Sequence, residues 1–393
     1  MSKISPEDHR PKASIADAYI LFFVSLLLVV TIGTVVQAIS LPVGLSLTEI
    51  LLILLPAVAY VRLKRLGVSN SLRWNSMSLG IALRSMILGV SGWGMAMVVY
   101  LATVPVVEEL LGSDPSSGWF IEAIPETIAQ LGVFLIVMAV LPGLCEETLF
   151  RGAIQGTFEK RGVWKGVIYA AILFAVYHLN PWNFIPAIAL GVLFGVVTVR
   201  TNSILPAMVC HVSNNCTAVI MTFIYRGDEN KAYLLLGALT VLFALAMWEF
   251  FYHTRHATWQ PSPLAIAPAH LSRRLKKIAK YAATLLVVLM ITAFVGFRAF
   301  FHGYRMVSDE LSPEIDRGER VLVLKCRYID VDIQLGDVIA FKRDGHTLLR
   351  RVVQTEGDSF WIVEKSAGGE DSEIEVQRGE VIGKVVYSLK IGD

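Results

Sequence analysis

The stretch AYILFFVSLLLVVTIGTVVQAI, residues 18–39, contains 22 residues without one charged side chain. A helix rises about 1.5 Å per residue, so this stretch is long enough to cross a hydrocarbon core about 30 Å thick. It is too long for a cleaved signal peptide, and no small-residue cleavage site follows it. The fold is therefore predicted to form in a membrane.

Further apolar stretches extend this prediction over the first three quarters of the chain. They lie at about 45–61, 85–107, 127–143, 166–199, 203–225, 232–252 and 281–300. The composition agrees, because 54% of the 393 residues are hydrophobic and only 17% are charged. Soluble proteins carry about 25% charged residues. We predict a polytopic membrane protein with about nine or ten spanning or re-entrant helices.

The character of the chain changes near residue 302, after which charged residues and short β-branched runs alternate with Gly-Asp and Asp-Gly turns. The expected strands are RVLVLK, DVIAFK, TLLRRVVQ, SFWIVEK and EVIGKVVYSL. The predicted fold class is therefore an all-α polytopic membrane bundle with a small C-terminal soluble all-β domain. We divide the chain into N-terminal transmembrane helices (1–120), a polar-residue-bearing membrane core (121–252), a Pro-rich and then basic linker (253–280), a last transmembrane helix (281–302) and the β domain (303–393).

The positions of lysine and arginine predict the topology. They collect in residues 3–12, 62–84, 160–165 and 255–280, and such residues favour the cytoplasmic side of a membrane. This places the β domain outside the cytoplasm, provided that residues 144–161 do not cross fully. If they do cross, the polar residues of the core come level with one another but one loop breaks the charge rule. Both topologies remain open.

Two features exclude other classes of protein. The net charge is only +2, which gives no case for binding nucleic acid. The four cysteines, Cys145, Cys210, Cys216 and Cys326, form no CxxC pair, so we predict neither a disulfide framework nor cysteine metal ligands.

The segment LCEETLFRG, residues 144–152, places three charges within the apolar core. A charge at the centre of a bilayer costs at least about 2.5–3.5 kcal/mol, so such residues indicate a function. Glu147 and Arg151 are four residues apart and are expected to pair on one helix face. Glu146 points about 100° away and has no local partner. It is a candidate general acid or base.

Two later helices carry polar residues at the same spacing. His178 follows Phe174 by four residues, and His211 precedes Asn215 by four. A single intramembrane histidine is commonly a hydrogen-bonding group, and one Glu–Arg pair is commonly structural. Costly residues on three neighbouring helices favour a shared site instead.

The three motifs EETLFR (146–151), FAVYH (174–178) and HVSNN (211–215) together resemble those of the CPBP family. This family contains CAAX prenyl endopeptidases (Rce1-like) and bacteriocin-processing or self-immunity (Abi) membrane proteins. The resemblance covers about residues 125–225 and implies an intramembrane endopeptidase. It implies that Glu146 and His178 activate a water and that His211 and Asn215 bind the oxyanion.

The resemblance leaves the cofactor open, because family members have been described both as metalloproteases and as metal-independent glutamate proteases. Glu146, His178 and His211 could form a three-ligand zinc site. Asparagine is a poor zinc ligand and a good oxyanion donor, which favours the metal-free mechanism. The expected partners are the lipid bilayer and a peptide or membrane-protein substrate. The alternative is a non-enzymatic immunity or scaffold protein that binds a partner through its β domain.

The β domain resembles the catalytic domain of type I signal peptidases, which are Ser–Lys proteases. Leu311 and Pro313 match the methionine and proline of that family's motif, and Ser308 matches a supporting serine. The nucleophilic serine then falls on Glu310 and the general-base lysine on Arg350. Arginine stays protonated, so this resemblance implies a catalytically dead module kept for binding or positioning. The alternative is an unrelated small β barrel.

Overall fold

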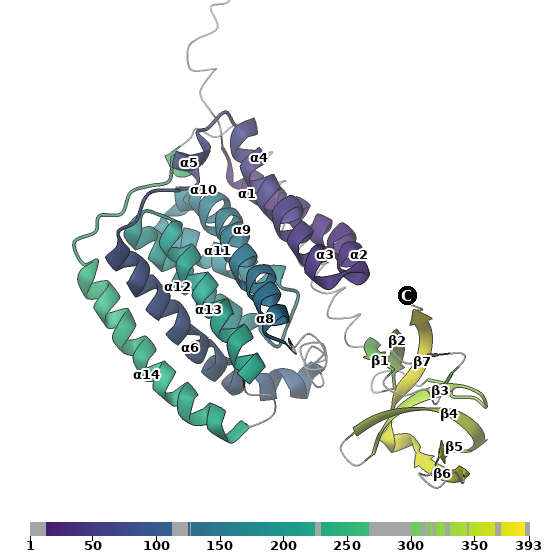
Figure 1. Ribbon diagram of the computed structural model, residues 1–393. Coiled ribbons are helices and arrows are strands. Elements are labelled where there is room, and N and C mark those ends of the chain that lie inside the picture. Colours follow the sequence, from purple (N-terminus) through teal and green to yellow (C-terminus); the bar gives the residue numbers. More distant parts are fainter. Residues whose placement is uncertain are drawn as a thin grey trace, which may run out of the picture. The chain divides into compact units, whose positions relative to one another are not determined.

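The computed structural model forms two compact units, one of helices and one of strands (Figure 1). It describes residues 13–111, 125, 127–224, 229–266 and 301–389, apart from 307–310, 313–314, 317–319, 327–330, 344–345 and 366–370. The predicted fold class, a helical membrane bundle with a C-terminal all-β domain, is confirmed.

The membrane unit is built of helices in which short π-helical segments (η2 to η5) interrupt the α-helices. Those before residue 125 are α1 (Ile15–Leu28), η2 (Val29–Gly33), α2 (Thr34–Ile39), α3 (Leu41–Leu47), η3 (Thr48–Leu54), α4 (Leu55–Leu63), α5 (Val68–Ser71) and α6 (Leu79–Leu111). Those after it are α8 (Ile128–Leu135), η4 (Ile136–Val140), α9 (Leu141–Glu147), η5 (Thr148–Gln155), α10 (Gly156–Phe158), the 3-10 turn η6 (Glu159–Arg161), α11 (Val163–Tyr177), α12 (Phe184–Thr201), α13 (Leu205–Ile224), α14 (Glu229–His253) and α15 (Pro263–Ile266).

Within the described residues, seven helical spans are long and apolar enough to cross a membrane, and Val163–Tyr177 is a shorter apolar helix. The chain is therefore a multi-pass integral membrane protein, as predicted. The predicted last transmembrane helix, 281–302, lies outside the described residues except for its final two, which already belong to a strand.

Capping boxes begin two of the spans. Ser14 accepts a hydrogen bond from the Asp17 backbone N–H at the start of α1, and the Asp17 carboxylate accepts one from Ser14 in return. Thr127 and Gln130 form the same reciprocal pair at the start of α8. Each box satisfies backbone donors that the first turn of a helix leaves unpaired.

The structure joins two segments that the sequence separates. Residues 127–143 and 144–161 read as distinct elements, but Ile128–Arg161 is one continuous span of 34 residues. Pro142 lies in the first turn of α9, directly after the π-helical η4. A change of helical type at this point accommodates a proline that would break a regular α-helix. Glu146 consequently lies near the middle of the long span.

The helix α9 occupies the interior of the bundle, where it packs against α13, η3, η4 and η5 (Figure 1). Gly143 allows the close approach to α13, because a Cβ atom there would lie 2.4 Å from Val212 Cγ2 and 3.1 Å from the Val212 backbone nitrogen. The three helices that carry the predicted motifs are thereby brought together, since α13 also packs against α12, and α12 against α11.

Part of the predicted linker 253–280 is anchored to the bundle. Arg73 and Glu159 form a buried ion pair with two 2.7 Å contacts, and Arg73 also donates to the Gln260 carbonyl at 2.7 Å. The Ser262 backbone N–H donates to Glu159 at 3.3 Å. Leu264 is fully buried. Residues 260–266, which belong to the predicted linker, therefore contact the helical unit in the structure.

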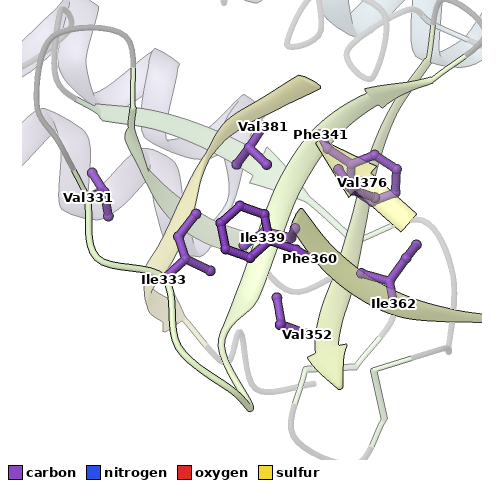
Figure 2. Packing of buried hydrophobic residues seen from close by; sticks show 9 residues of the cluster. All are labelled: Val331, Ile333, Ile339, Phe341, Val352, Phe360, Ile362, Val376 and Val381. Atoms are coloured by element: carbon purple, nitrogen blue, oxygen red, sulfur yellow. The ribbon is translucent and has the colours of Figure 1, made fainter. Parts of the chain in front are cut away.

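The β unit is one antiparallel sheet in the order β1-β2-β7-β3-β4-β5-β6. Its strands are β1 (Phe301–Arg305), β2 (Arg320–Lys325), β3 (Val338–Arg343), β4 (His346–Glu356), β5 (Ser359–Lys365), β6 (Asp371–Gln377) and β7 (Val381–Leu389). Its core includes Phe341, Phe360 and Val376 (Figure 2). The Gly336 and Gly357 turns have φ values of +91° and +58°, which glycine adopts readily. The five expected strands are present, and β1 and β6 were not predicted.

Candidate functional site

Glu147 lies at the centre of a buried polar cluster formed by the continuous span Ile128–Arg161 and α13. Its Oε1 atom accepts from Arg151 Nη1 at 2.9 Å and lies 2.8 Å from His211 Nδ1. Glu147 and Arg151 are completely buried, and His211 is 3% exposed. The i,i+4 pair expected from the spacing is therefore present and is extended by a histidine from α13. Both basic side chains therefore contact the same carboxylate oxygen.

Two phenylalanine rings enclose this cluster. The Arg151 guanidinium lies 4.4 Å from the Phe174 ring centroid and 5.2 Å from that of Phe194. His211 stacks on Phe194 with centroids 4.7 Å apart and an interplanar angle of 19°. Cation–π contacts gain strength where water is excluded. The rings fix the orientation of both basic side chains, and Phe194 was not singled out from the sequence because it looks like an ordinary core residue.

Glu146 differs from its neighbour. It is 8% exposed, and its Oε2 atom has no hydrogen-bond partner. The nearest basic group is His211, whose Nε2 atom lies 3.9 Å from that oxygen. This distance is too long for a hydrogen bond but leaves a polar gap between a carboxylate and an imidazole. The two adjacent glutamates therefore differ in their partners, and their separate roles stay a prediction.

His178 follows the last residue of α11, and its side chain is exposed. Its Nδ1 atom lies 2.8 Å from the Phe174 carbonyl oxygen, which can only accept, so Nδ1 carries the proton. In the neutral ring, Nε2 is then a free acceptor. No hydrogen bond or ion pair joins this histidine to Glu146 among the described residues. The Phe174 ring contacts the imidazoles of both His178 and His211, at centroid distances of 4.6 and 5.8 Å.

Asn215 is engaged with the protein itself. Its Nδ2 atom donates to the Met138 carbonyl at 3.1 Å, and its Oδ1 atom accepts from Asn214 at 3.0 Å. The side chain thus ties α13 to η4. In this arrangement one of its amide N–H groups is engaged by the Met138 carbonyl.

The three zinc ligands suggested by the sequence, Glu146, His178 and His211, do not come together in one cluster. Within the described part of the chain, no group of three His, Cys, Asp or Glu side chains lies close enough together to hold a metal ion. Glu146 and His211 approach one another, whereas His178 lies apart at the end of α11. The residues present therefore do not fit a three-ligand catalytic zinc site.

Glu49 is a buried acid that our sequence reasoning missed. It lies in η3, is 6% exposed, and has an Oε2 atom without a hydrogen-bond partner. The signal was available, because Glu49 is the one acidic residue in the apolar span Leu41–Leu63. Glu49 was not predicted because it belongs to none of the three motifs. The segment η3 that carries it packs on α9, the helix of Glu146.

The membrane unit resembles a known class of protease. Residues 128–217 match the family model described as type II CAAX prenyl endopeptidase Rce1-like, and this range contains all four predicted catalytic residues. Residues 278–378 match signal peptidase, peptidase S26. Both resemblances inferred from the sequence are thereby confirmed. The first match supports a membrane endopeptidase in general, acting on a peptide or a membrane protein.

Curated relatives match the signal-peptidase part. They include proteins named "Inactive signal peptidase IA" from Staphylococcus aureus strains Mu50 / ATCC 700699 and N315, each 27% identical over 86 residues. The matched region is 22% of this chain and 49% of each relative, so the chain spans about half the length of the curated relatives it matches. No solved structure matches the chain.

The β unit places an arginine where the resemblance expects the general-base lysine. Arg350 lies in β4 opposite Ile339 of β3, is 9% exposed, and donates from Nη1 to the Leu349 carbonyl at 2.9 Å. A guanidinium cannot take up a proton at ordinary pH. Glu310, the expected nucleophile position, lies outside the described residues, so its predicted ion pair with Arg350 stays a prediction.

Proposed function

We propose that the membrane unit is an intramembrane endopeptidase in which Glu146 activates the attacking water. The observation that carries this proposal is the unpartnered Oε2 atom of Glu146, buried 3.9 Å from His211 Nε2. Glu147 is paired with Arg151 and hydrogen-bonded to His211, which leaves Glu146 as the carboxylate available for proton transfer. The Rce1-like match over residues 128–217 supports the same reaction class.

In the proposed reaction, a water oxygen attacks the carbonyl carbon of a peptide bond while Glu146 takes a proton from that water. The carbonyl electron pair moves onto oxygen, where the Nε2–H group of His211 stabilises it. Nδ1 of the same ring already faces Glu147, so donation from both nitrogens requires the imidazolium form. The intermediate then collapses, the C–N bond breaks, and Glu146 returns its proton to the leaving amine.

His178 and Asn215 take secondary parts in this proposal. The Nε2 lone pair of His178 assists in holding the water, because its Nδ1 proton is directed at the Phe174 carbonyl. Asn215 becomes an oxyanion donor only when substrate displaces its contact with the Met138 carbonyl. Until then it fixes the distance between α13 and η4.

The test compares membrane and secreted peptides from cells that produce wild-type protein, Glu146→Gln or Glu249→Gln. Glu249 is the matched control, because it lies on α14 in a half-exposed ion pair with Arg84. A peptide that disappears only in the Glu146→Gln cells supports the proposal and identifies the substrate. Unchanged peptides in all three strains would refute it.

A second candidate function is a membrane scaffold or immunity protein that binds a partner through its β unit. Arg350 at the expected lysine position favours binding over catalysis for this unit, as does the word "inactive" in the names of its relatives. This candidate predicts that a Glu146→Gln protein keeps its phenotype at normal membrane levels. The endopeptidase predicts loss of the phenotype.

The lysine and arginine distribution further leads us to place the β unit on the extracytoplasmic side. Protease added to sealed right-side-out membrane vesicles should then remove residues 301–389 and leave the helical unit intact. Protection of the β unit would reverse this assignment.

A further inference from the structure

Glu49 is a second buried carboxyl of the membrane unit, and the mechanism above does not use it. It is 6% exposed and lies inside the 23-residue apolar span Leu41–Leu63. An intramembrane acid costs several kcal/mol on insertion unless its surroundings offset that cost. The cost of burying Glu147 is offset by its contacts with Arg151 and His211. Among the described residues, no basic side chain forms an ion pair with Glu49.

The charged neighbour of Glu49 is another acid. The helical segment η3 packs directly on α9, and the Glu49 and Glu146 carboxyls interact electrostatically. The Cys145 thiol and the Tyr177 hydroxyl also interact electrostatically with both carboxyls. Both acids also have an Oε2 atom that is buried and lacks a hydrogen-bond partner.

The backbone that carries Glu49 is held firmly in place. The Ser25 hydroxyl donates to the Leu52 carbonyl of η3 at 2.7 Å and lies 2.7 Å from the Tyr177 hydroxyl. Three elements, α1, η3 and α11, therefore meet one turn from Glu49. π-helical segments such as η3 frequently occur at functional sites. This anchoring would keep the acid from turning away from Glu146.

When two buried carboxyls lie close together, ionisation of one disfavours ionisation of the other, and a directly contacting pair shares one proton. One member is then a neutral acid that can donate an O–H hydrogen bond to the other. We propose that Glu49 is a positioning residue that donates such a hydrogen bond to Glu146 and so directs the second Glu146 oxygen at the water. This inference rests on the proposed function, because Glu146 is the group that Glu49 serves.

The test uses the full-length protein and the peptide that the Glu146→Gln comparison identifies. Glu49→Leu keeps the size of the side chain and removes the donor, whereas Glu49→Gln keeps an N–H donor at the same place. Glu49→Leu should lower kcat about 10- to 100-fold with little change in KM, as expected for a lost hydrogen bond to a charged group. Glu49→Gln should retain most of the wild-type kcat. A Glu49→Leu enzyme as active as wild type would overturn the inference, as would a Glu49→Gln enzyme as impaired as Glu49→Leu.

A spectroscopic measurement keeps the inference testable if Glu49→Leu fails to fold. The infrared carbonyl band of a protonated carboxyl should be present in the wild-type protein and absent from Glu49→Gln. Persistence of this band in Glu49→Gln would overturn the shared proton whether or not any variant cleaves peptide. Cleavage by Glu146→Gln would instead refute the proposed function, so the two failures are distinguishable.

Discussion

The two units of this chain differ in the charged residues that occupy their protease-like sites. In the membrane unit, Glu146, Glu147 and Arg151 are retained where burial of charge is costly, and a histidine from another helix meets them. In the β unit, the position expected to hold a basic lysine carries Arg350, packed against the carbonyl of its own strand. The membrane unit thus keeps costly buried charges, whereas in the β unit an arginine stands at the position where the resemblance expects a lysine.

The largest expected effect concerns the buried ion pair between Glu147 and Arg151. Arg151→Met leaves the completely buried Glu147 with His211 as its remaining basic partner. We expect a loss of about 3–5 kcal/mol in the free energy of unfolding, because the buried carboxylate loses its guanidinium partner. Thermal unfolding of the full-length protein in detergent measures it. The double variant Glu147→Gln/Arg151→Met is the control and should be less destabilised. Equal losses would show that the charge is not the cause.

The next effect tests whether His211 acts in the reaction. His211→Gln keeps a donor toward Glu147 and removes the Nε2–H group beside Glu146. Loss of one oxyanion donor should reduce kcat by about 10²–10³-fold, equivalent to about 2.7–4 kcal/mol. The matched control is His253→Gln at the exposed end of α14, which should leave kcat unchanged. Equal activity of both variants would remove His211 from the mechanism.

A smaller effect tests the close contact that brings α9 to α13. Gly143→Ala introduces a Cβ atom 2.4 Å from Val212 Cγ2, so the helices must move apart at a cost of about 1–3 kcal/mol. The control is Gly132→Ala in α8, where a Cβ atom meets nothing within 4 Å. That change should stabilise the helix by about 0.5–1 kcal/mol. Unfolding measurements that show both variants less stable than wild type, or both more stable, would contradict the close contact between α9 and α13.

The smallest expected effect concerns the β unit. Arg350→Lys restores the side chain that the resemblance expects, yet we predict no gain of peptide cleavage and no labelling by a serine-directed phosphonate. The described Ser312 donates its hydroxyl to Asp316 at 2.7 Å and lies on the surface, so it is no nucleophile prepared for attack. Labelling of Ser308 or Ser312 in the wild-type protein would show that the unit is an enzyme after all.

The sequence predicted local elements well where one pattern dominated. The strands RVLVLK and SFWIVEK begin and end as expected, because alternating β-branched residues are bounded by turns. β6 was missed because DSEIEVQ is mostly acidic and polar, and β1 because FHGYR follows a long apolar run directly. These strands are specified by pairing with β5 and β2 rather than by their own composition.

By itself, the sequence determined that the chain spans a membrane, that a β unit follows, and that Glu147 and Arg151 share a helix face. These properties follow from apolar length and from spacing along one element. Only the tertiary structure decided that His211 meets Glu147, that Asn215 donates to the Met138 carbonyl, and that η3, which carries Glu49, packs on α9. Such contacts join residues far apart in the chain, and the packing of helices sets them because helix spacing carries no information about which neighbour a face will meet.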